Sequence, residues 1–159
     1  MPSRLLLAAL VLVPLAGCPA PAEVEPATPD RPVYDATPDD LDEARQRWAD
    51  AGLGAYTMTL QRICFCPSPD YTGPFEVDVA DGAVTEVRLG GTPVDAERGE
   101  SVEDLFELLE EAYAKDAERV EVTYDAALGY PTSISIDYSQ MMADEEIAYR
   151  VSALTRADG

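Results

Sequence analysis

The sequence predicts an α+β domain in which two helices pack on one face of an antiparallel sheet, in the order α-β-β-β-α-β-β-β. Two segments repeat apolar residues at helical spacing, and six shorter segments alternate apolar and polar residues as half-buried strands do. Hydrophobic residues make up 47% of the chain, which is enough for a core. Two amphipathic helices need an apolar surface to cover, and one face of an antiparallel sheet supplies it.

The first helix is predicted to begin after Thr37, whose hydroxyl can accept a hydrogen bond from the first turn. Pro38 occupies the first helical position, where its fixed φ suits the helix and its missing N–H costs nothing. Leu41 and Trp48 recur at helical spacing, so this side of the helix should be buried. Gly52 stands where the helix should end.

Three strands are predicted to follow this helix. The first covers residues 55–66, where apolar and polar residues alternate, and a loop over 67–73 comes next. Residues 75–79 alternate in the same way. Asp81-Gly82 is a two-residue hairpin signal, which predicts an antiparallel return strand over residues 83–89.

The second helix is predicted to begin at Ser101, with Asp104 in the position of a capping box. Apolar residues line one side of residues 102–113, and acidic residues line the other. We expect the acidic side to be solvated rather than a binding site. Its members are Glu103, Asp104, Glu107, Glu110 and Glu111.

Three more strands are predicted over residues 120–124, 134–138 and 147–151, with a chain reversal at 125–131. Most aromatic side chains fall on the inward faces of these elements and should fill the core. Tyr71 in the loop and Tyr130 in the reversal are the exceptions, so both are candidate exposed anchors for a partner. The aromatic residues expected in the core are Trp48, Tyr56, Tyr113, Tyr124, Tyr138 and Tyr149.

Charge and composition exclude several classes of function. The 159 residues hold 11 Lys and Arg against 31 Asp and Glu, a formal net charge of -20. Nucleic acid is a poor partner for such a chain, because its recognition needs clustered Lys and Arg. The absence of His removes the Ser-His and Cys-His catalytic pairs and the imidazole metal ligand. We therefore expect no catalytic residue, no metal site and no cofactor, and we expect that the protein is not an enzyme.

Residues 1–17 are typical of an export signal peptide. Arg4 gives the positively charged n-region, an apolar run of a dozen residues follows, and small residues precede Cys18. The apolar run is shorter than the roughly 20 residues of a membrane-spanning helix, and Pro14 interrupts it. We expect this segment to be cleaved. Its removal takes Arg4 away and leaves 10 basic and 31 acidic residues, a net charge of -21.

The sequence Leu15-Ala16-Gly17-Cys18 resembles the lipobox of bacterial lipoproteins, in which the Cys thiol receives a diacylglycerol and the chain is cut before it. The alternative is a plain secretory signal whose Cys is incidental. Each buried methylene of an acyl chain contributes about 0.8 kcal/mol, so a di- or triacylated Cys18 is a lasting membrane anchor. Residue 19 is Pro rather than Asp, so by resemblance to the enterobacterial sorting rule we expect the outer membrane, with the domain in the periplasm or at the cell surface.

Residues 18–38 are predicted to form a tether between the lipid and a single domain over residues 39–156. Six of the thirteen prolines fall in residues 19–38. Such a stretch favours an extended, semi-stiff conformation at about 3.1 Å per residue. An alternative is that Val33 and Tyr34 dock onto the domain, which would shorten the tether.

Cys64 and Cys66 are the only thiols left once Cys18 is lipidated, in a compartment that favours disulfides. In a regular strand their Cα atoms would lie roughly 6.6 Å apart on one face, near the upper limit for a disulfide. A bridge across so few residues would be strained and easily reduced. Three interpretations stay open: a structural bridge or two packed thiols, a redox or mixed-disulfide site, and a metal site of two thiolates assisted by acidic side chains.

Three pieces of the chain occur together in a fairly specific combination. They are Tyr56 followed by Cys64-Phe65-Cys66, the helix Val102-Glu103-Asp104-Leu105-Phe106, and Tyr124-Asp125 with Gly129-Tyr130-Pro131 leading into Ile134-Ser135-Ile136-Asp137. Over about residues 39–155 this pattern resembles an uncharacterised family of bacterial lipoproteins, classed as a domain of unknown function. The resemblance implies a lipoprotein with one domain, in which Cys64 and Cys66 act as a unit, and it implies no activity or ligand.

The leading hypothesis is a non-enzymatic, lipid-anchored envelope domain that binds a protein or peptide through sheet edges or loops. The anchor at Cys18, the tether and the lack of catalytic constellations favour it. One alternative is a thiol-redox protein that uses Cys64 and Cys66. Another is an acidic module that binds a small ligand or a cation.

Overall fold

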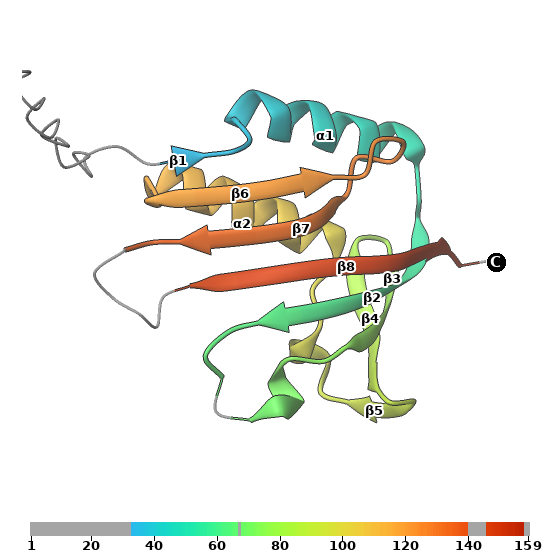
Figure 1. The fold of residues 1–159 in the computed structure, drawn as a ribbon. Helices are drawn as coiled ribbons and strands as arrows, with labels where there is room; N and C mark the ends of the chain where they lie inside the picture. Colours follow the sequence, from blue (N-terminus) through green and yellow to red (C-terminus); the bar gives the residue numbers. More distant parts are fainter. Residues whose placement is uncertain (1–32, 67, 140–145, 158–159) are drawn as a thin grey trace, which may run out of the picture.

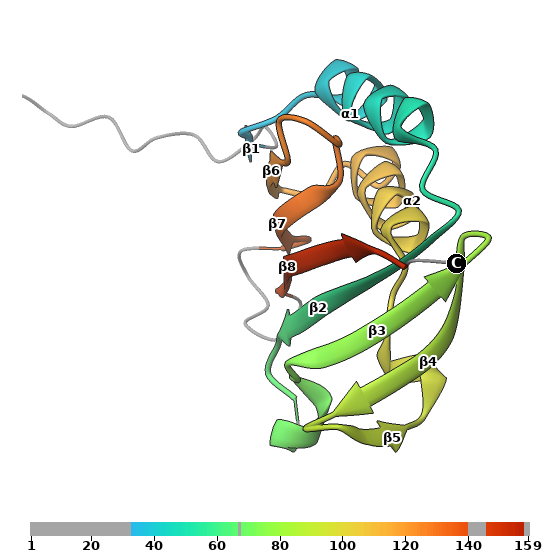
Figure 2. The same cartoon turned by 90° about the vertical axis from the view of Figure 1, so that its right-hand side faces the viewer.

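The computed structural model describes residues 33–66, 68–139 and 146–157. They form an eight-stranded sheet with two α-helices on the same side of it, as Figures 1 and 2 show from two directions. The predicted α+β class and the predicted order of helices and strands are confirmed. Two short strands, β1 (Val33–Tyr34) and β5 (Thr92–Val94), are additional to the prediction.

Helix α1 (Pro38–Ala51) begins and ends where local chemistry predicts. The Thr37 hydroxyl accepts from the Asp40 N–H at 3.2 Å, and the Asp40 carboxylate accepts from the Thr37 N–H at 2.7 Å, which closes a capping box. Gly52 follows the helix at φ 58°, in the left-handed region that Gly adopts without penalty. The buried side of the helix includes Leu41 and Trp48, as expected.

Helix α2 (Val102–Ala114) is capped in the same way. The Ser101 hydroxyl accepts from the Asp104 N–H at 3.1 Å, and the Asp104 carboxylate accepts from the Ser101 N–H at 2.8 Å. Its buried side packs on the sheet and on α1, and includes Leu105, Phe106 and Leu109.

The first predicted hairpin is confirmed. Strands β3 (Phe75–Ala80) and β4 (Ala83–Leu89) are antiparallel and pair Ala80 with Ala83 across the Asp81-Gly82 turn. Strand β2 (Ala55–Ile63) pairs with β3, but it ends three residues before the predicted end at Cys66. The reason is local, because a disulfide between Cys64 and Cys66 brings their Cα atoms to 5.2 Å, closer than a regular strand allows.

The C-terminal strand joins the two halves of the sheet. Strands β6 (Arg119–Tyr124) and β7 (Pro131–Asp137) form a hairpin, and β8 (Ile147–Arg156) pairs with β7 on one side and β2 on the other. The order across the sheet is β1-β6-β7-β8-β2-β3-β4-β5. In Figure 1 the red β8 lies between the orange β7 and the green β2.

Strand β1 starts the described domain six residues earlier than the predicted boundary at residue 39. Val33 and Tyr34 pair in parallel with Arg119 and Val120 of β6. The structure therefore shows the alternative in which this end of the predicted tether docks onto the domain. Cys18 and most of the tether lie outside the described residues.

The core lies between the helices and the sheet. Buried residues alternate along β2 and β3, for example Tyr56, Met58 and Leu60 in β2, and their more exposed neighbours form the opposite face. Among the aromatic residues expected inside, Trp48, Tyr56 and Tyr149 are buried. The others pack against the core while partly exposed, and they are Tyr113, Tyr124 and Tyr138.

Candidate functional site

The exposed large hydrophobic side chains of the described residues gather in one short segment at the end of β2. Phe65 is 89% exposed, Ile63 46% and Tyr71 42%. Single exposed hydrophobic residues are ordinary on a protein surface, but three within nine residues of the chain make this segment the candidate interaction site. We name this segment, residues 63–71 with Pro67 outside the described residues, the tip loop.

The ends of the tip loop are held together by the backbone. The Arg62 N–H donates to the Thr72 C=O at 3.0 Å, so the segment leaves β2 and returns to almost the same point. A short 3-10 helix, η1 (Pro69–Tyr71), forms its second half, and the Tyr71 N–H donates to the Ser68 C=O at 3.1 Å. Compact surface loops with close ends of this kind commonly carry function.

The disulfide between Cys64 and Cys66 forms the first half of the tip loop. Both cysteines are half-buried, whereas Phe65 between them points to solvent. A ring closed across one residue restricts the backbone of Phe65, so less conformational freedom remains for a partner to remove on binding. The two sulfur atoms that the sequence singled out therefore lie beside the most exposed aromatic side chain of the described chain.

A hollow of about 270 Å³ lies beside Phe65. The tip loop forms one wall with Ile63, Cys64 and Phe65. The other wall comes from β7, β8 and the residue before β8, and it consists of Ser135, Glu146, Ile147 and Ala148. The site thus combines a protruding aromatic side chain with an adjacent recess that one side chain of a partner can enter.

Tyr71 is exposed, as expected from its place in the loop. The Arg98 guanidinium lies 4.7 Å above its ring and donates to the Asp70 C=O at 2.7 Å, which fixes the ring's orientation. Tyr130 is placed differently. It is partly buried, and its ring packs edge-on against Trp48 at 6.3 Å, so it fills the core boundary rather than projecting from it.

A half-buried ion pair involves Arg62, the residue that directly precedes the tip loop. Arg62 Nη2 lies 2.7 Å from Glu100 Oε1, and the guanidinium also lies 5.4 Å above the ring of Tyr149. Burial raises the pKa of the Glu100 carboxyl, and the Arg62 charge opposes that rise. Sequence reasoning missed this pair, because 38 residues separate its members and neither belongs to a recognisable motif.

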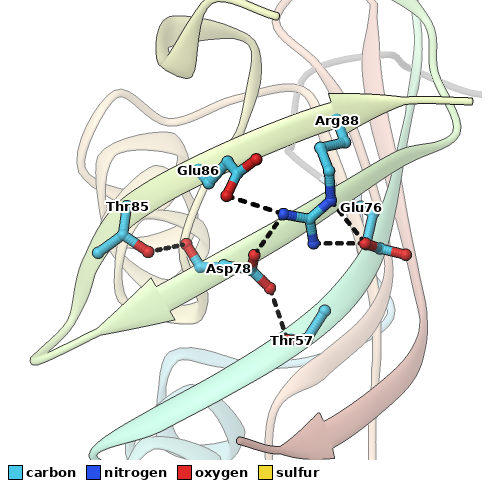
Figure 3. A network of polar contacts seen from close by, with 6 residues as sticks. All are labelled: Thr57, Glu76, Asp78, Thr85, Glu86 and Arg88. Carbon is cyan, nitrogen blue, oxygen red and sulfur yellow. Dashed lines mark hydrogen bonds and ion pairs between the residues drawn. The ribbon is translucent and has the colours of Figure 1, made fainter. Parts of the chain in front are cut away.

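A second polar cluster lies on the sheet face opposite the helices (Figure 3). Arg88 meets three carboxylates: its Nε donates to Glu76 at 2.8 Å, and Nη1 lies 2.7 Å from Asp78 and 3.0 Å from Glu86. The Thr57 hydroxyl donates to Asp78 at 2.6 Å. The Thr57 hydrogen bond and Arg88 lower the pKa of Asp78, so the cluster is largely satisfied within itself and stabilises β3 and β4.

The described residues offer neither a metal-binding cluster nor a membrane-spanning helix. Within the described ranges, no three His, Cys, Asp or Glu side chains gather closely enough to hold a metal ion. No helix in the same part of the chain is long and apolar enough to cross a membrane. Cys18 lies outside the described residues, so its lipidation remains a prediction.

On helix α2, Glu103 does not share the exposure of its acidic neighbours. Glu103 was expected on a fully solvated acidic side, but it is half-buried. Its carboxylate accepts from the Trp48 indole N–H at 2.9 Å and from the Tyr56 hydroxyl at 3.0 Å. Helical periodicity placed it at the edge of the buried side, and only the fold brings α1 and β2 against it.

Comparison with known proteins places the chain in a family. It belongs to DUF6174, a family of unknown function, whose sequence profile matches residues 40–156. Searches of curated proteins and of solved structures found no match to the chain.

Proposed function

We propose that this member of DUF6174 is a lipid-anchored domain of the bacterial cell envelope that binds a protein partner through the tip loop and is not an enzyme. The observation that carries the proposal is the 89% exposure of Phe65 on a disulfide-closed ring, with Ile63 and Tyr71 beside it in the chain. The anchor rests on the lipobox at Cys18. The non-enzymatic role rests on the lack of His and of a catalytic constellation in the sequence.

The tip loop is a better contact surface than the edges of the sheet. The outermost strands are β1 and β5, with two and three residues, and β5 contains Pro93, which has no N–H to offer. Short edge strands and edge prolines hinder the addition of another strand. We therefore place the partner's contact on side chains of the tip loop rather than on backbone hydrogen bonds.

The expected contact is small and depends on an aromatic anchor. Burying a Phe side chain contributes about 1.5–3 kcal/mol, and aromatic residues are common among the few that dominate an interface. An anchor of this size alone gives weak binding. Confinement of both proteins to one membrane surface raises their effective concentration, so weak contacts are sufficient for a lasting complex.

Photo-crosslinking in intact cells tests the proposed contact. A photoreactive amino acid is placed at Ile63, in the tip loop, or at the exposed Ala126, in the β6–β7 turn, as a control. We expect an adduct of discrete mass from position 63 and none of that mass from position 126. Adding Phe65→Ser should abolish the adduct while the free energy of unfolding changes by less than about 0.5 kcal/mol, because the side chain is exposed.

Two results would count against this contact. The first is an adduct at position 63 that Phe65→Ser leaves unchanged. The second is equal crosslinking from positions 63 and 126, which would indicate random collision at the membrane.

Fractionation and labelling test the anchor separately. Cys18→Ala should release the protein from the membrane fraction and abolish incorporation of radiolabelled palmitate, because the acylated thiol is gone. Persistent membrane binding of the variant would refute the lipid anchor. Confinement of the protein to the membrane by the lipid could then no longer account for lasting binding through the tip loop.

A thiol-redox role is a second candidate, favoured by the disulfide beside an exposed side chain. In that role a partner thiolate attacks one sulfur, forms a mixed disulfide and releases the other sulfur as a thiolate. Intact-mass measurement after alkylation, with and without reductant, tests the starting point. We expect both Cys64 and Cys66 to be alkylated only after reduction, and two free thiols in the native protein would remove this candidate.

A further inference from the structure

A second concave surface lies far from the tip loop in the chain, between the two helices. It is a groove of about 660 Å³, within the usual size range of small-molecule sites. The end of α1 and the residues after it form one wall, with Trp48, Ala49 and Leu53. Helix α2 forms the other wall with Phe106 and three carboxylates.

Glu103 is a fixed carboxylate in this groove. Its two oxygens accept from Trp48 Nε1 at 2.9 Å and from the Tyr56 hydroxyl at 3.0 Å. The Tyr56 hydroxyl is itself held, because it accepts from the Val102 N–H at 2.7 Å. Both donors to Glu103 are neutral, and among the described residues it has no ion pair. A carboxylate has about four acceptor positions, so further donors can still bind.

The charge around the groove favours a cation. Glu107 and Glu110 line it together with Glu103, since residues four and seven apart share one side of a helix. Arg45 is the one basic residue that lines the groove within the described chain, and it already pairs with Glu110 and lies 5.5 Å above the Phe106 ring. The groove therefore presents an excess of carboxylates beside apolar walls.

We propose that this groove binds a small organic ammonium compound. Its ammonium group hydrogen-bonds to Glu103, and its apolar body packs against Trp48 and Leu53. The three carboxylates that line the groove disfavour an anionic ligand, and an ammonium group gains charge-assisted hydrogen bonds to the Glu103 carboxylate. The proposal does not depend on the tip loop or on the membrane anchor.

The single Trp of the chain provides the assay, because Trp48 lines the groove. The full chain is titrated with phenethylammonium chloride while Trp48 emission is followed. Matched titrations use 2-phenylethanol, which has the same body without charge, and 3-phenylpropanoate, which has the opposite charge. We expect a saturable change with the amine and none with the other two compounds over the same concentration range.

Glu103→Gln tests the site, with Glu97→Gln as the control for charge. Glu97 is exposed in a short 3-10 helix outside the groove. Loss of a charged hydrogen-bond partner should weaken binding of the amine about tenfold or more in Glu103→Gln, whereas Glu97→Gln should bind as the unaltered chain does. Far-UV circular dichroism checks that both variants are folded, which we expect because the Gln carbonyl still accepts one of the two hydrogen bonds.

Three results would overturn the proposal. They are an equal response to 2-phenylethanol, an unchanged affinity in folded Glu103→Gln, and saturation by a lysine-containing tripeptide under conditions where the amine gives no response. The last result would assign the groove to a peptide instead.

Discussion

The hydrogen bonds of Tyr56 allow a sharp test of the packing between α1, α2 and β2. Its side chain is 1% exposed, and its hydroxyl accepts from the Val102 N–H and donates to Glu103. Tyr56→Phe keeps the ring and its edge-on contact with Trp48, whose centroid is 5.2 Å away. The substitution removes only the oxygen.

The expected loss of stability follows from the two hydrogen bonds that disappear with the Tyr56 hydroxyl. Val102 is fully buried, and its N–H belongs to the first turn of α2, where no carbonyl of the helix can accept it. An unsatisfied buried N–H and a lost hydrogen bond to a carboxylate together cost about 2–3 kcal/mol. For a domain of this size that corresponds to a fall in Tm of roughly 8–12 °C.

Tyr124 supplies a matched control. Its hydroxyl is also buried, but it has no hydrogen-bond partner among the described residues. Tyr124→Phe therefore removes a desolvated polar atom, and we expect an unchanged free energy of unfolding or a gain of up to about 1 kcal/mol. Urea unfolding followed by far-UV circular dichroism compares the variants without relying on Trp48 emission. Equal destabilisation by the two substitutions would refute the hydrogen-bond argument.

Two further predictions concern stability. Gly129→Ala should cost about 2–5 kcal/mol by urea unfolding, since φ is 84° and the new Cβ would lie 2.2 Å from the Ala44 carbonyl oxygen; a loss below 1 kcal/mol would contradict this contact. Asp78→Asn should cost about 0.5–1 kcal/mol at pH 7. The Thr57 hydrogen bond and Arg88 lower the pKa of Asp78 below its ordinary 3.8, so its stabilisation is present above about pH 4 and is lost as the pH falls through the folded-state pKa. The difference between wild type and variant should therefore shrink in acid, and a pH-independent difference would show that the ion pair is not its source.

Part of the candidate site followed from local sequence. Cys64 and Cys66 are two residues apart, so their pairing required no knowledge of distant segments, and Tyr71 is exposed in the loop where it was expected. Tyr130 was also expected to be exposed, but it is partly buried because its ring packs against Trp48 of helix α1. The exposure of a side chain depends on which segments pack against it, and the tertiary structure decides which segments those are.

The sequence by itself determined the elements whose causes lie within a few residues. The Thr37 N-cap, the Ser101 capping box, the Asp81-Gly82 hairpin and the alternation of β3 depend on neighbouring side chains and backbone geometry, so they could be predicted. Tertiary structure alone decided that β8 lies between β7 and β2, that Val33–Tyr34 pairs with β6, and that Glu103 faces a groove. The physical reason is that burial and pairing energies depend on which surfaces meet, and surfaces far apart in the chain carry no local signal of each other.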